Sequence, residues 1–298
     1  KGLEEAAAGA TFGASAGGVA ALILIYLMFL FNKKSIKEEI KSSAHNKTEP
    51  VWDVVKSLLY IAIPITIGAS IAPLMGITDS YIVSNRLSAI GYTNVQIADM
   101  FGELSGTAQT LINFPQVFST AVAMSLVPAI TEAFTKKQYS KLSETANVGV
   151  KMSLIIGLPC GIGLLMLAEP VIALLYSSLG PEKHASSGAL LEILAIGVIF
   201  LTLVQAFTAI LQSINKQFHP VKNLAVGLVV KVILSYILIG MPAINIKGAA
   251  ISTTISYLVV ALLNWKDINS TKIKINLIKV SSRTVLSSAF MALATGVS

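Results

Sequence analysis

The sequence is poor in charge and in chemically reactive side chains. Only 12% of its 298 residues are charged, 54% are hydrophobic, and it has a single cysteine. A typical soluble domain is about a quarter charged, and a water-soluble fold of this composition would expose large apolar patches. The low charge therefore excludes soluble enzymes, nucleic-acid-binding proteins and disordered linkers, in spite of a net charge of +7. With Cys160 alone, a disulfide within the chain is excluded as well.

Catalytic and metal-binding patterns are also missing. The three histidines, at positions 45, 184 and 219, are isolated from one another, and the acidic residues are scattered along the chain. No HExxH motif and no Cys/His cluster occurs. We therefore predict no enzyme activity, no catalytic residues, no cofactor and no metal site.

Long apolar runs are the main feature that the sequence does have. About 20 residues span the hydrocarbon core of a bilayer. The runs cover approximately residues 6–31, 57–84, 106–133, 150–168, 189–214, 224–241, 248–265 and 280–298. This pattern predicts an all-α integral membrane protein with about eight transmembrane helices.

The basic residues alternate between the two sides of this layout. Of the 22 lysines and arginines, 17 fall in the connections at 32–56, 134–151, 215–223 and 266–283. Cytoplasmic loops carry an excess of Lys and Arg, so these four connections are predicted to be cytoplasmic and residues 87–99 and 181–187 external. The expected location is the plasma membrane of a bacterial-type cell, as a multi-pass protein.

Two formal charges fall well inside the predicted membrane helices, Asp79 and Lys231. A charge in the membrane interior costs at least about 3 kcal/mol, so such residues face a cavity or a partner. Each residue therefore either lines a functional cavity or pairs within the bundle. Arg86 follows Asp79 by seven residues, at the outer boundary of the same predicted helix, and the neutral Asn113 and Gln205 suit interhelical hydrogen bonds.

Proline and the chain ends give two further expectations. Prolines at 64, 73, 115, 128 and 159 interrupt three of the runs and predict kinks, as expected of moving helices but also common in static bundles. The sequence begins at Lys1 and ends inside an apolar run. We therefore expect an interior portion of a longer membrane protein.

Several stretches resemble a known superfamily. The most specific are IPITIGASIAPLMGITDSYIVSNRL at 63–87 and GTAQTLINFPQVFSTAVAMSLVPAITEAF at 106–134. GATFGASAGGVAAL at 9–22, VKVILSYILIG at 230–240 and KGAAISTTISYLV at 247–259 also fit. They resemble the multidrug/oligosaccharidyl-lipid/polysaccharide (MOP) flippase superfamily. Within it they are similar to the stage V sporulation protein B and polysaccharide biosynthesis branch, related to the MurJ lipid II flippases.

The resemblance implies a MATE-like fold of two six-helix lobes around a central cavity, followed by a C-terminal helix pair. On that arrangement, residues 1–31 are the last helix of the N-terminal lobe and 32–56 a cytoplasmic interlobe linker. Residues 57–265 form the six-helix C-terminal lobe, and 266–298 a cytoplasmic loop and the start of a truncated C-terminal helix. The implied partners are the lipid bilayer, an undecaprenyl-linked glycan and the missing N-terminal lobe, with no nucleic acid.

The implied function is transport of lipid-linked oligosaccharide, peptidoglycan or polysaccharide precursors by alternating access. The expected substrate or ion pathway contains Lys231, Asp79, Arg86, Asn113 and Gln205. Cationic side chains suit an anionic pyrophosphate, and Asp79 suits a coupling ion. MurJ-type flippases carry an arginine five residues before the proline that corresponds to Pro115, where this chain has Thr110. Two alternatives remain open: an ion-coupled multidrug or metabolite exporter of the same fold, and a non-transporting membrane assembly protein.

Overall fold

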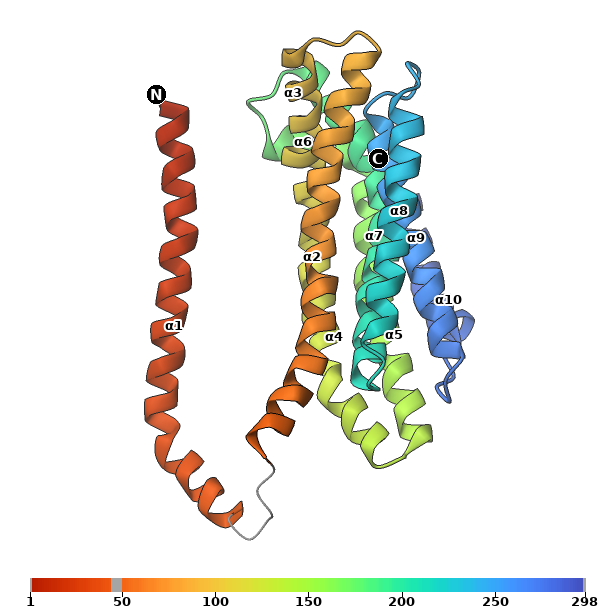
Figure 1. Ribbon diagram of the computed structural model, residues 1–298. Helices are drawn as coiled ribbons and strands as arrows, with labels where there is room; N and C mark the ends of the chain where they lie inside the picture. The colour runs from red at the N-terminus through yellow and green to blue at the C-terminus, as the bar shows by residue number, and fades with distance from the viewer. Residues whose placement is uncertain (1, 44–49, 297–298) are drawn as a thin grey trace. The chain divides into compact units, whose positions relative to one another are not determined.

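The computed structural model describes residues 2–43 and 50–296 (Figure 1). All regular structure in these two ranges is helical. The elements are α1 (Gly2–Ser43), α2 (Val51–Ala89), α3 (Asn94–Gly102), the π-helix η1 (Glu103–Ala108), α4 (Gln109–Thr135), α5 (Tyr139–Met166), α6 (Ala168–Leu175), α7 (Pro181–Ser213), α8 (Phe218–Ile239), α9 (Lys247–Asn269) and α10 (Leu277–Gly296).

Seven helical segments within the described ranges are long and apolar enough to cross a membrane. They coincide with the first seven apolar runs of the sequence, which confirms the prediction of an all-α, multi-pass membrane protein. The eighth run forms α10, in which the described apolar segment Thr284–Leu293 is shorter than a membrane span. Several helices are longer than their apolar runs, because polar residues at their ends continue the same pattern of backbone hydrogen bonds.

The chain divides into two compact units, residues 1–59 and 60–298, and the boundary falls within the residue range of α2. In the first unit, α1 is one continuous helix of 42 residues. It continues to Ser43, so residues 32–43 of the segment predicted as a linker are helical. The rest of this section concerns the second unit.

Local sequence signals explain several of the helix ends. Gly91 has a φ of +98°, which a residue with a side chain rarely adopts, and it turns the chain after α2. Thr93 then caps α3, because its side chain accepts a hydrogen bond from the Gln96 backbone and the Gln96 side chain reaches back to the Thr93 backbone. α7 begins with Pro181, whose missing N–H is harmless at the first helical position.

Three short elements were not anticipated from the apolar runs. α3 lies mostly in the segment that the sequence predicts to be an external connection. η1 overlaps the beginning of the apolar run at 106–133, which predicts a single helix. α6 follows α5 after a break at Leu167, whose φ and ψ are −113° and 24°. The run at 150–168 ends one residue after this break, so nearly all of α6 lies beyond it.

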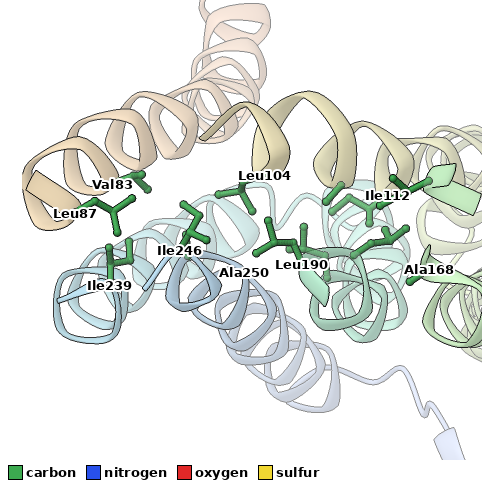
Figure 2. Packing of buried hydrophobic residues seen from close by; sticks show 14 of the residues in the cluster. Val83, Leu87, Leu104, Ile112, Ala168, Leu190, Ile239, Ile246 and Ala250 are labelled. Carbon is green, nitrogen blue, oxygen red and sulfur yellow. The ribbon is translucent and has the colours of Figure 1, made fainter. Parts of the chain in front are cut away.

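α7 is the most buried of the membrane helices, with 61% of its apolar window inside the bundle. It packs against α4, α5 and α9. Figure 2 shows one part of the core, a cluster of buried hydrophobic residues that includes Leu190 of α7. The other labelled members are Val83, Leu87, Leu104, Ile112, Ala168, Ile239, Ile246 and Ala250.

Two glycines of α5 allow α7 to approach closely. A Cβ added to Gly157 would collide with the Thr202 side chain. A Cβ on Gly161 would lie 2.9 Å from both the Ala195 carbonyl oxygen and the Ile199 Cγ1 atom. Small residues at helix contacts bring backbones together in membranes, where van der Waals packing drives association.

Candidate functional site

The two charges predicted inside the membrane form an ion pair. Lys231 Nζ of α8 donates a hydrogen bond to Asp79 Oδ2 of α2 at 2.6 Å. The Lys231 side chain is 5% exposed and that of Asp79 is 14% exposed. Lys231 lies eight residues before the end of α8, which is about 12 Å along the helix axis. The pair therefore lies deep within the part of the bundle that the membrane surrounds.

The ion pair is one of several contacts along a single seam between α2 and α8. The contacts advance together along both helices, so α2 and α8 run parallel. In chain order they are the edge-to-face rings of Tyr60 and Phe218, the close approach of Gly68 to Val221, the pair of Asp79 with Lys231, and the contact of Arg86 with Tyr236.

Arg86 closes the far end of this seam. Its Nε donates a hydrogen bond to the Tyr236 carbonyl oxygen at 3.0 Å, and its guanidinium carbon lies 4.2 Å from the centre of the Tyr236 ring. A Cβ on Gly240 would collide with the same guanidinium group. A cation suits the C-terminal end of α8, where helix carbonyl groups lack partners. Arg86 thus anchors α2 to the end of α8.

Two polar side chains that the sequence analysis did not select lie beside the ion pair. The Tyr257 hydroxyl of α9 lies within electrostatic range of both the Gln109 side chain of α4 and Asp79. Both residues are half-buried. Gln109 lies in the same motif as Asn113, and Tyr257 lies in an otherwise apolar and hydroxyl-rich run. In the sequence each is one polar group among several in its membrane helix, so neither stands out.

The pair leaves one carboxylate oxygen open. Asp79 Oδ1 is buried and accepts no hydrogen bond from the residues that the structure describes. A buried acceptor without a donor costs free energy, so it favours uptake of a proton or of another cationic partner. Within the described ranges, no three His, Cys, Asp or Glu side chains gather as metal ligands.

Within the described ranges, no hydrogen bond or ion pair joins Asn113 or Gln205 to the pair. Asn113 of α4 is exposed, as is Thr110 one turn before it, and Gln205 of α7 is half-buried. The structure thus brings together Asp79 and Lys231, and it places Arg86 further along the same two helices.

Comparisons with known proteins identify the family. The family profile described as lipid II flippase MurJ matches residues 3–297. Stage V sporulation protein B of Bacillus subtilis is 26% identical over 269 residues, covering 88% of this chain and 49% of that protein. The lipid II flippase MurJ of Bacillus subtilis is 26% identical over 257 residues, covering 86% of this chain and 46% of the relative. The chain spans about half the length of these curated relatives.

Solved structures agree on the fold. A lipid II flippase MurJ in an inward closed conformation has a TM-score of 0.65 at 17% identity, over 86% of this chain and 51% of that one. A MOP superfamily transporter from Pyrococcus furiosus has a TM-score of 0.62 at 18% identity, over 80% and 54%. The fold is therefore of the MOP type, and with a profile match that covers nearly every residue, the chain belongs to the lipid II flippase MurJ family.

Proposed function

We propose that this chain is the C-terminal half of a flippase that moves lipid-linked oligosaccharides, such as peptidoglycan or polysaccharide precursors, by alternating access. The observation that carries the proposal is the match of the lipid II flippase family over residues 3–297. The relatives are about twice as long as this chain, and a second lobe of similar length would complete the central cavity. The role is transport and not catalysis.

The buried ion pair gives this proposal a physical mechanism. While Asp79 holds Lys231, both charges are compensated and the seam between α2 and α8 is closed. An anionic pyrophosphate headgroup competes with Asp79 for the lysine ammonium group. Once Lys231 turns to the headgroup, the released carboxylate takes a proton or a cation, because an unpaired buried charge is costly. Substrate binding would then be linked to a change at the α2–α8 seam.

The test of the function is reconstitution of the full-length protein in liposomes that contain a lipid-linked oligosaccharide. A membrane-impermeant glycosidase cleaves only the headgroups on the outer surface. We expect the protein to bring the inner half of the substrate within reach of the enzyme, whereas protein-free liposomes keep it protected. Protection equal to that of the protein-free control would refute flipping. Efflux of a cationic dye down an ion gradient, without any loss of headgroup protection, would instead establish the exporter alternative.

The orientation of the chain is a second proposal, based on the split of basic residues. We expect Val95→Cys, whose parent side chain is 73% exposed, to be labelled from outside intact cells. Ser270→Cys, in the connection after α9, should be labelled only after the membrane is opened. Both substitutions are made in a Cys160→Ser background, so that a single thiol reacts. Labelling of Ser270→Cys in intact cells would reverse the orientation.

A further inference from the structure

A hollow of about 460 Å³ lies between the beginning of α8 and the end of α9, two helices that pack against each other. Its lining includes the basic side chains of Lys222 and Lys266. Both lysines are exposed, and neither forms an ion pair with any residue that the structure describes. The hollow thus holds two ammonium groups whose charge no acidic side chain takes up.

One wall of the hollow is a fixed polar network. Asn223 is only 5% exposed, and its Nδ2 donates hydrogen bonds to Asn264 Oδ1 at 2.9 Å and to Asp267 Oδ2 at 2.7 Å. His219 Nδ1 lies 3.2 Å from the same Asp267 oxygen. The one carboxylate of the lining is therefore already engaged by an amide and an imidazole. Because its position is fixed by these partners, Asp267 cannot swing across to neutralise the lysines.

Polarity changes with depth in this hollow. Lys222 lies about one turn inside the start of α8, and Lys266 lies in the last turn of α9. Val226 and Leu263 line the hollow about one turn deeper on each helix. Charged groups at the helix ends with apolar walls beneath them match an amphiphile whose headgroup is anionic. The α8 N-terminus adds partial positive charge on the same side.

The charge of the lining selects among anionic headgroups. The two lysines and the one carboxylate of the lining together carry an excess of one positive charge. A phosphodiester carries one negative charge, whereas a pyrophosphate carries more. Basic pockets between membrane helices are known sites for the headgroups of anionic lipids.

We infer that the hollow between α8 and α9 binds an anionic phospholipid, with its phosphodiester between Lys222 and Lys266 and an acyl chain along Val226 and Leu263. The site is separate from the Asp79–Lys231 pair, since Lys222 and Lys231 are nine residues or about 14 Å apart on α8. It lies on the side that the basic residues predict to be cytoplasmic.

The experiment is a calorimetric titration of the full-length protein in detergent with short-chain phosphatidylglycerol. We expect the Lys222→Gln/Lys266→Gln variant to bind roughly 10- to 30-fold more weakly. Each lysine near an anionic lipid surface contributes about 1 kcal/mol of attraction, and about 1.4 kcal/mol corresponds to a tenfold change in affinity. The matched control is Lys137→Gln/Lys141→Gln, which removes two exposed charges, one in the α4–α5 connection and one in the first turn of α5, and should bind like the parent. Equal weakening in both variants would overturn the inference, because it would reflect total charge alone.

Two further arms identify the ligand. Phosphatidylcholine, which has no net charge, and glycerophosphoglycerol, which lacks acyl chains, should both bind much more weakly than phosphatidylglycerol. Binding of glycerophosphoglycerol as tight as that of the lipid would overturn the lipid assignment in favour of a soluble phosphodiester. A photoreactive phosphatidylglycerol should label peptides containing residues 218–226 and 263–267 in the unaltered protein. Labelling confined to other helices would overturn the site without relying on any variant.

Discussion

Replacing Lys231 with methionine should sharply lower the yield of folded protein, and adding Asp79→Asn should restore most of it. The single substitution leaves a buried carboxylate without its ammonium partner. Breaking a buried pair in this way costs about 3–5 kcal/mol, whereas replacing both charges by neutral groups can be nearly neutral. The measurement is the fraction of monodisperse protein in detergent, with thermal unfolding of the material recovered.

The control for this experiment lies on the same helix. Lys222→Met also exchanges a lysine of α8 for methionine, but this lysine is exposed and lacks an ion-pair partner in the described part of the chain. It should therefore fold like the parent. The double variant Lys231→Met/Asp79→Asn then isolates function, because it should fold and yet fail to flip the lipid-linked substrate. Full transport by this well-folded double variant would remove the ion pair from the mechanism.

A single methyl group at Gly161 should destabilise the bundle by about 1–3 kcal/mol, the usual cost of overpacking. The new Cβ would lie 2.9 Å from the Ala195 carbonyl oxygen, which belongs to the backbone of α7 and cannot rotate away. Relief requires α5 and α7 to separate along a contact made by the most buried helix of the structure. We expect Gly161→Ala to lower the thermal unfolding midpoint in detergent.

Gly163→Ala is the matched substitution, two residues along the same helix. There the nearest atom to a new Cβ is the Met291 Cε, at the ordinary contact distance of 3.8 Å. It should leave the midpoint unchanged or raise it slightly, since alanine favours the helix over glycine. Equal midpoints for the two variants would show that the α5–α7 contact adapts freely, contrary to the packing argument.

The sequence was sufficient for the fold class because hydrophobic length is a direct physical requirement of the bilayer. It was insufficient for the short helices. Nearly all of α6 lies beyond the apolar run at 150–168, and its eight residues are too few to span a membrane. α3 is too polar to register as a membrane segment. Helix ends set by caps, such as the one at Thr93, fall outside a hydropathy pattern altogether.

For the site, the sequence identified Asp79 and Lys231 individually but not as partners. Their contact joins residues 152 positions apart, and it depends on α2 and α8 lying parallel side by side. No periodicity within either helix specifies which distant helix lies beside it. The sequence did not identify Tyr257 and Gln109 for a related reason. An uncharged polar group in a membrane helix indicates a site only when its neighbours in space are known.

The parallel seam between α2 and α8 has a consequence for how the protein is made. Ribosomes add about 5–20 residues per second, so roughly 8–30 s pass between synthesis of Asp79 and synthesis of Lys231. During that interval α2 carries an acidic group into the membrane before its partner exists. The nascent helix must wait with that carboxyl neutralised or in contact with the water of the insertion machinery. Insertion of α8 then supplies the ammonium group that Asp79 lacks, so this contact of the bundle is completed long after α2 is made.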